Sequence, residues 1–394
     1  MRGKQNMWIV AFMFLIMALN AVVDNTKGIL IPVFKEVFNT NNTDIGLMIS
    51  VGTFGYIIFT YIGGILCEKI GQKKVFLFGI IFMTSSLFLM STAKTFSILV
   101  ICMFFMNVGN AFLSIGINTL IPLIFISFQA IIMNLTHFCF GLGSTIGQVT
   151  VGYLIDGGMS WRNVYLFMAM SFLLVLLAFN FLKVPIAHKA KGNKNLNISS
   201  VFKNKLFYFY SIGLGTYVFS EVGTASWLVN FLQESYKFTP SKSAIYLSSF
   251  FLVFTIGRLI GGFIVEKIGY LKSVIISLII ALILFSAALL IGEAALILIC
   301  ASGLFFAIAF PTITVTIGKV FKENGAYVTG VVITFCSVVN MILNFIIGKL
   351  NDAIGASKAF YMIPMSLFIS IVFIYLIYSN TKNNLTLRQV AQNE

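Results

Sequence analysis

Charged side chains are scarce in this chain. They make up only 10% of its 394 residues, whereas a typical soluble domain carries about 25%. A polypeptide with so few charges cannot cover a folded surface with groups that water solvates well. Apolar residues make up 59% of the sequence instead. The composition therefore excludes an ordinary soluble protein and indicates that lipid is the main solvent of the folded chain.

The patterns that carry catalysis, metal binding or ATP hydrolysis are also missing. The sequence contains no G-x-x-x-x-G-K-[ST] motif and no C-x-x-C pair, and it has only two histidines. Its five cysteines stand singly within or near apolar runs, so we expect free thiols. We predict no enzymatic activity, no cofactor and no metal site.

Long apolar runs are what the sequence has in abundance. Crossing a hydrocarbon core of about 30 Å takes about 20 apolar residues in a helix. About twelve such runs lie near residues 8–32, 45–66, 75–92, 96–122, 131–155, 163–184, 206–232, 243–265, 273–292, 295–318, 327–349 and 359–379. We therefore expect an all-α integral membrane protein with twelve transmembrane helices.

The distribution of basic residues sets the expected orientation in the membrane. With the N-terminus inside, the inner segments hold 17 of the 26 Lys and Arg side chains and the outer segments hold 7; Lys27 and Arg258 fall within helices. Lys and Arg gather in cytoplasmic loops. We predict a multi-pass protein of the inner membrane with both termini cytoplasmic. The net charge of +14 then needs no nucleic-acid partner.

One polar segment divides the runs into six and six. Residues 185–205 are rich in lysine and asparagine, as a cytoplasmic linker beside an anionic leaflet would be. We expect an N-terminal six-helix half over 1–184, a linker over 185–205, a C-terminal six-helix half over 206–380 and a cytoplasmic tail over 381–394. A monomer is expected.

A small motif recurs at the end of every third run, where a glycine is followed four residues later by an acid. The acids of the two halves correspond at offsets of 198 and 196 residues, and two copies end inside while two end outside. Each half then contains two three-helix units of opposite orientation, as in many transporters. The copies are Gly64 with Glu68, Gly152 with Asp156, Gly262 with Glu266, and Gly348 with Asp352; a further glycine follows three of them, at Gly71, Gly269 and Gly355.

Two of these copies resemble the signature of the major facilitator superfamily. Residues 64–74 read GILCEKIGQKK, and residues 257–269 read GRLIGGFIVEKIG. The resemblance implies two pseudo-symmetric six-helix bundles, each built from 3+3 inverted repeats, and a role for the signature in stabilising one access state. The alternative is that these residues only fix turns and topology. The gating residues so implied are Gly64, Glu68, Gly71, Lys73, Lys74, Arg258, Glu266 and Gly269.

A few ionisable groups lie inside the runs, and such groups are functional candidates because they are costly in a bilayer. Asp24 and Glu221 are 197 residues apart, so they occupy equivalent positions in the two halves. We predict that they are proton-coupling residues, with His137 as a third candidate. Lys27 lies three residues after Asp24 and can neutralise it, which favours Glu221. Alternatively, both acids are static gate partners and His137 is only a polar anchor.

Polar residues follow helical spacing on several of the runs. In the superfamily, the first, fourth, seventh and tenth helices line a central cavity, so the resemblance places the stripes of the first, fourth and seventh runs there; the eleventh run carries a comparable stripe. The residues predicted to bind substrate are Asn20, Asn110, Ser114, Tyr217, Trp227, Asn340 and Asn344.

Several segments are similar to the fucose–galactose–glucose porter branch of the superfamily, of the fucose permease type. They are residues 28–38, 133–137, 140–143, 222–228 and 310–313. Gly28, Ser114 and Phe140 stand where that pattern has two acids and an asparagine, so neither fucose nor proton symport follows directly. The resemblance favours alternating-access transport of a sugar or related metabolite, coupled to protons.

Two alternatives remain open. Residues 143–148 read GSTIGQ, close to a motif of drug antiporters but with Gln148 in place of its proline. This favours a proton-coupled exporter of drugs or hydrophobic metabolites. The other alternative is a membrane sensor that transports nothing.

Overall fold

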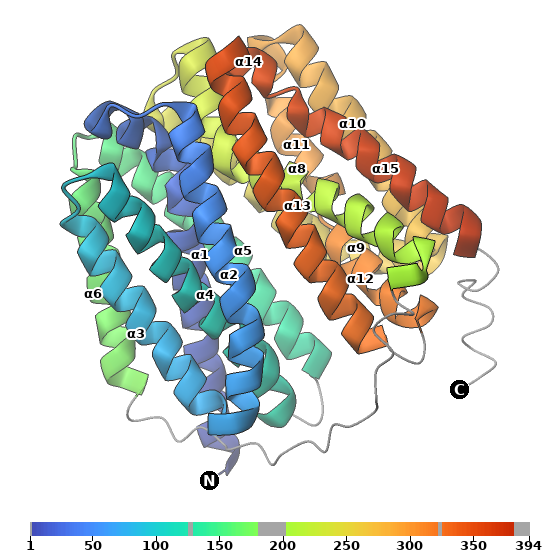
Figure 1. The fold of residues 1–394 in the computed structure, drawn as a ribbon, viewed down its shortest axis with the longest axis horizontal. Helices are drawn as coiled ribbons and strands as arrows, with labels where there is room; N and C mark the ends of the chain where they lie inside the picture. The colour runs from blue at the N-terminus through green and yellow to red at the C-terminus, as the bar shows by residue number, and fades with distance from the viewer. Residues whose placement is uncertain (1, 125–128, 180–201, 322–324, 382–394) are drawn as a thin grey trace. The chain divides into compact units, whose positions relative to one another are not determined.

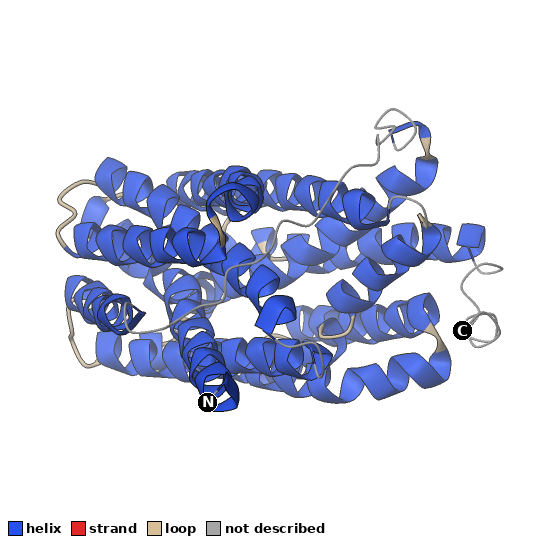
Figure 2. Cartoon of the chain, turned by 90° about the horizontal axis from the view of Figure 1, so that it is seen from below, coloured by secondary structure: helices blue, strands red, loops and turns tan. Residues whose placement is uncertain are grey.

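The computed structural model describes residues 2–124, 129–179, 202–321 and 325–381, and the regular elements in these ranges are helices (Figures 1 and 2). In chain order the first are α1 (Arg2–Phe38), α2 (Asn42–Ile70), α3 (Gln72–Ser91), α4 (Phe96–Ile124), α5 (Gln129–Asp156) and α6 (Trp161–Phe179). They are followed by α8 (Lys205–Tyr236), α9 (Pro240–Ile268), α10 (Tyr270–Ile291), the 3-10 turn η1 (Glu293–Ala295), α11 (Ile297–Phe306), α12 (Ala309–Val320), α13 (Gly325–Ile354), α14 (Ala356–Ala359) and α15 (Met362–Thr381).

Eleven spans among the described residues are long and apolar enough to cross a membrane. The pair α11–α12 makes one of them, as does the pair α14–α15. The helix α8 is not among the eleven, although its 32 residues give it a length of about 48 Å. Glu221 and a series of tyrosines, serines and glycines lower its hydropathy. The expected all-helical membrane architecture is confirmed.

The described helices form two compact units. The first contains α1 to α6 together with the start of α9 as far as Ser248, and the second contains α8, the rest of α9 and α10 to α15. Most of the expected linker, and nearly all of the expected tail, lie outside the described residues, so the predicted domain boundaries stay predictions.

The same helix pairs pack together in both units. In the first unit α1 packs on α5, and α3 packs on α4 and α6; in the second unit α8 packs on α13, and α10 packs on α11 and α15. These are the pairings that two copies of one six-helix plan would share.

The turn glycines of the sequence motif have nearly the same backbone conformation. The φ and ψ angles are 88° and 152° at Gly71, 99° and 152° at Gly269, and 83° and 157° at Gly355. This region of conformational space is essentially restricted to glycine. Each glycine ends one helix and starts the next within a single residue, which explains why the motif repeats at these helix ends.

The glycines of α5 have a packing role. A Cβ atom at Gly143 would overlap the backbone carbonyl of Ala18 on α1, and one at Gly147 would come within 2.8 Å of the Val22 side chain. Small residues let membrane helices approach closely. The glycine-rich segment therefore holds α5 against α1, without any need for an export function.

A break separates α11 from α12. Neither Ala307 nor Ile308 belongs to either helix. Pro311 follows within the first turn of α12, and it has no N–H to donate to the carbonyl four residues before it. Carbonyl groups at this break are thus open to partners from other helices.

Candidate functional site

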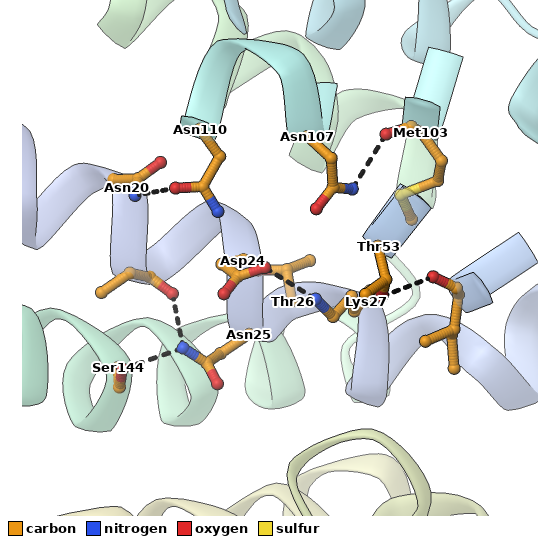
Figure 3. A network of polar contacts seen from close by, with 12 residues as sticks. Asn20, Asp24, Asn25, Thr26, Lys27, Thr53, Met103, Asn107, Asn110 and Ser144 are labelled. Atoms are coloured by element: carbon orange, nitrogen blue, oxygen red, sulfur yellow. Dashed lines mark hydrogen bonds and ion pairs between the residues drawn. The ribbon is translucent and has the colours of Figure 1, made fainter. Parts of the chain in front are cut away.

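In the first unit, polar side chains of α1 and α4 meet near the middle of their helices (Figure 3). The amide nitrogen of Asn20 donates to Oδ1 of Asn110 at 2.9 Å. Asn20 is buried, and its own Oδ1 is a buried acceptor without a hydrogen-bond partner. Buried polar atoms normally find a partner, so this oxygen is open to a ligand.

Asp24 and Lys27 form an ion pair within α1. The Lys27 Nζ lies 2.6 Å from Asp24 Oδ1, and the side chains are 28% exposed for Asp24 and 16% for Lys27. Both residues belong to the same helix, one turn apart, so the pair is local. The carboxylate and ammonium neutralise each other without help from another helix.

Two further contacts in this unit link helices far apart in the sequence. The amide of Asn25 donates to Ser144 Oγ on α5 at 2.9 Å, and Tyr56 on α2 donates to Ser114 Oγ on α4 at 3.4 Å. Sequence reasoning found Ser114 but missed Tyr56, Asn25 and Ser144. The helical spacing on one run gives no signal for a partner on another run.

In the second unit, the acid on α8 contacts Tyr217 on its own helix and Arg258 on α9, and Tyr217 also reaches α11. The hydroxyl of Tyr217 lies 2.7 Å from Glu221 Oε2 and also 2.7 Å from the carbonyl oxygen of Phe306, at the end of α11. Arg258 on α9 places Nη2 3.9 Å from Glu221 Oε1. The arginine also lies over the ring of Phe254, 4.5 Å from its centroid.

The sequence motif assigned Arg258 to a gate at the cytoplasmic side. Its ion-pair partner in the described structure is instead Glu221, the proton-coupling candidate. No pattern in the sequence indicates this contact, because it depends on how α8 and α9 are placed against each other.

Trp227 links α8 to α13. Its indole N–H donates to Asn344 Oδ1 at 3.1 Å, and the amide nitrogen of Asn344 donates in turn to Asn340 Oδ1 at 2.9 Å. All three residues are buried. The tryptophan ring is thus fixed in the core of its unit, and stacking on a sugar would require it to become uncovered.

Apart from Arg258, the predicted gating residues lie at or near helix ends. Gly71 and Gly269 form the turns described above, while Lys74 and Glu266 are exposed. Lys73 lies 5.9 Å from the centroid of the Phe179 ring, and Gly64 has open space where a Cβ would be. The side chain of Glu68 lies outside the described residues. The gating role of this group stays a prediction.

His137 lies two turns into α5 and is exposed. It is not among the residues that form the polar contacts of Asp24 or Glu221 described above. Its predicted part in proton coupling stays untested.

An apolar pocket of about 230 Å³ lies between α1, α5 and α6. Leu19, Val23, Val151 and Phe172 are among the residues that line it. Since sugars bind through hydrogen bonds as well as apolar contacts, this pocket does not suit a polar solute. The five cysteines are free thiols, and within the described ranges no three His, Cys, Asp or Glu side chains gather as metal ligands would.

Comparisons with known proteins fit this arrangement. The chain is 27% identical over 374 residues to the glucose/galactose transporter of Brucella abortus biovar 1 (strain 9-941), with 90% of each chain covered. Its fold matches a bacterial homolog of the human lysosomal transporter Spinster, with a TM-score of 0.76 at 16% identity over 94% of this chain and 95% of that one. The fold also matches the E. coli fucose:proton symporter, with a TM-score of 0.65 at 20% identity over 94% of this chain and 99% of that one.

The model of the Major Facilitator Superfamily matches residues 13–339. This match covers most of the chain and confirms the resemblance carried by residues 64–74 and 257–269. The chain therefore belongs to the major facilitator superfamily, and it is a multi-pass membrane protein that transports small solutes.

Proposed function

We propose that the protein carries a sugar or a related small polar metabolite across the cytoplasmic membrane by alternating access, in symport with protons. The similarity to a glucose/galactose transporter over nine-tenths of both chains supports the substrate class. The fold that it shares with a proton symporter is compatible with this mechanism. Both termini are placed in the cytoplasm, as the distribution of Lys and Arg favours.

The substrate would bind through paired amides. An amide side chain offers both a donor and an acceptor, which suits sugar hydroxyls. The unpartnered Oδ1 of Asn20 gives the first unit an acceptor that a hydroxyl can fill. Asn110 and Ser114 would also take part in the first unit, and Tyr217, Trp227, Asn340 and Asn344 would take part in the second unit.

The observation that carries the proposal is an acid with a basic partner inside the helices of each unit, with the two acids 197 residues apart as the repeat predicts. Charges within membrane helices are costly and are retained mainly where they have a function. Glu221 is the main proton-coupling candidate, since its basic partner Arg258 comes from another helix and the contact can change. Asp24 comes second because Lys27 neutralises it within one helix.

The test is uptake of a panel of labelled sugars into proteoliposomes, with and without an inward proton gradient. We expect one sugar to accumulate only with the gradient and to leave when an uncoupler collapses it. Gradient-independent equilibration would contradict symport but preserve a sugar carrier. No uptake or counterflow of any sugar by folded protein would contradict the substrate class and shift the search to exported hydrophobic metabolites.

A further inference from the structure

The hydroxyl of Tyr217 has two oxygen neighbours at hydrogen-bonding distance. Glu221 Oε2 and the carbonyl oxygen of Phe306 each lie 2.7 Å from it. A tyrosine hydroxyl carries one proton, so it donates one hydrogen bond and accepts others. The backbone carbonyl can only accept. The number of protons between these three oxygens therefore depends on the protonation state of Glu221.

An ionised Glu221 leaves this arrangement one proton short. Tyr217 could donate its one proton to either Glu221 or the Phe306 carbonyl. The remaining pair of oxygens would then lie at a distance typical of a strong O–H···O bond with no hydrogen between them. A protonated Glu221 satisfies both contacts. The carboxylic acid donates to the Tyr217 oxygen, and Tyr217 donates to the Phe306 carbonyl.

The position of Arg258 agrees with a neutral acid. Charge-assisted N–H···O bonds are about 2.7–2.9 Å long, whereas Arg258 Nη2 lies 3.9 Å from Glu221 Oε1. The arginine lies over the Phe254 ring, and its Nε is buried without a hydrogen-bond partner. The guanidinium thus lies beside the acid without forming the close bond that a carboxylate would draw.

The Phe306 carbonyl is available because of the break between α11 and α12. Phe306 is the last residue of α11, and α12 starts only at Ala309. Carbonyls at a helix end lack partners within the helix and take them from elsewhere. Tyr217 is fully buried beside this break, so the interruption between α11 and α12 supplies the fixed acceptor for its proton.

We propose that Glu221 is protonated in this conformation, donating to Tyr217 while Tyr217 donates to Phe306, and that Arg258 becomes the partner of Glu221 when the proton leaves. This rests on the proposed function insofar as the proton drives transport. On deprotonation the proton passes to water, the O–H bond of the acid breaks, and the carboxylate draws the guanidinium into direct hydrogen bonding. Tyr217 is a positioning residue in this scheme.

Groups on several helices face this acid. Tyr217 lies on its own helix, Arg258 on α9, and the Cys336 thiol on α13 is close enough to interact with Glu221 electrostatically. Among these, Arg258 is the one cation. Exchange between a proton and Arg258 therefore gives the site two arrangements with different helix contacts, one with a net positive charge and one that is neutral, which is what a two-state switch needs.

The experiment is pH-dependent infrared difference spectroscopy on the purified full-length protein in lipid, without substrate. We expect a C=O stretching band from a protonated carboxylic acid that disappears as the pH rises, and we expect E221Q to lack it. A wild-type spectrum without such a band, or an E221Q spectrum that retains it, would overturn the proposal.

Two further variants test the partners. Y217F removes the acceptor of the Glu221 proton, so the band should be lost at lower pH than in the wild type. R258M removes the partner of the carboxylate, so the band should persist to higher pH. The matched control is Y210F, because Tyr210 is also buried on α8 but donates to Thr316 Oγ1; its band should follow the wild type.

If Tyr217 mainly donated to an ionised carboxylate, Y217F would shift the band to higher pH, and that result would overturn the assignment. Folding of each variant is checked by its elution from size-exclusion chromatography. Since the spectra need no substrate, failure to transport any sugar would leave this measurement intact, and the two proposals fail separately.

Discussion

Asp24 and Glu221 correspond in the predicted repeat, but the pairs that they form with basic residues are built differently. Asp24 and Lys27 stand one turn apart on α1, with their charged atoms 2.6 Å apart. Glu221 on α8 is held by Tyr217 and lies 3.9 Å from Arg258 on α9. The first pair moves as one body with its helix, whereas the second changes whenever α8 and α9 shift relative to each other. A pair that spans two helices can couple protonation to helix movement, and a pair within one helix cannot do so as directly.

The largest expected effect is the loss of gradient-driven sugar accumulation in E221Q. E221Q keeps a side chain that can donate to Tyr217 but cannot release a proton. We expect the variant to exchange sugar across the membrane and to equilibrate it, without accumulating it under a proton gradient. The measurement is counterflow and gradient-driven uptake in the same proteoliposome preparation.

A matched variant on the same helix is Y210F, which removes a buried hydroxyl from the Thr316 contact. Accumulation by Y210F should persist. Accumulation of sugar by E221Q under a proton gradient would contradict the proton-coupling role of Glu221. Nothing would then favour Glu221 over Asp24 as the coupling acid.

The second effect concerns Asp24. D24N leaves Lys27 without its partner, and an unpaired lysine at the centre of a membrane helix costs about 2.5–3.5 kcal/mol on insertion scales. We expect less folded protein and weaker uptake, and we expect the double variant D24N–K27M to recover both because it removes the two charges together. Folded protein is measured by size-exclusion chromatography, and uptake by labelled sugar.

Failure of the double variant to recover uptake, while the protein folds normally, would show that Asp24 acts directly in transport. Each unit would then contain an acid that takes part in coupling, Asp24 in the first and Glu221 in the second.

The third effect tests a feature in which the two units are alike. Gly71 and Gly269 have the same glycine-specific backbone conformation. G71A and G269A should each lower the free energy of unfolding by about 1–3 kcal/mol, the usual cost of such strain. The matched controls are G64A and G262A, because neither glycine has an atom near the position of an added Cβ.

Thermal unfolding of purified protein measures these differences. Equal melting temperatures for G269A and G262A would contradict backbone strain at Gly269. If G71A and G269A lowered the melting temperature by different amounts, the two turns would differ in strain despite their similar backbone angles.

The smallest effect concerns the amide pair of the first unit. The hydrogen bond between Asn20 and Asn110 should contribute about 0.5–1.5 kcal/mol, the usual net value for such a bond. A double-mutant cycle with N20A and N110A on unfolding measures this coupling. If the pair also binds substrate, both single variants should raise the KM for sugar; unchanged KM values would limit the pair to a structural role.

Much of the architecture could be predicted from the sequence. Apolar runs of sufficient length define membrane helices because the bilayer leaves few alternatives. The recurrence of Gly71 and Gly269 three residues after an acid has a direct backbone cause, since both need a conformation that other residues avoid. Local backbone requirements of this kind can be recognised in a single sequence.

The contacts of the candidate site could be predicted only in part. The Asp24–Lys27 pair follows from spacing on one helix, and the structure contains it. The contact of Glu221 with Arg258 and that of Tyr217 with the Phe306 carbonyl join three helices, and no spacing rule connects them. The motif that contains Arg258 pointed to a helix end, because side-chain direction and helix placement are not encoded in the motif itself.

The central claim is that the proton carried with the sugar binds to Glu221. The direct measurement is proton entry into proteoliposomes that contain a trapped pH indicator, started by adding the transported sugar in the absence of any gradient. We expect internal acidification by the wild type and by Y210F, and none by E221Q despite normal counterflow of sugar. Sugar-dependent acidification by E221Q would contradict the claim and place the proton on another group.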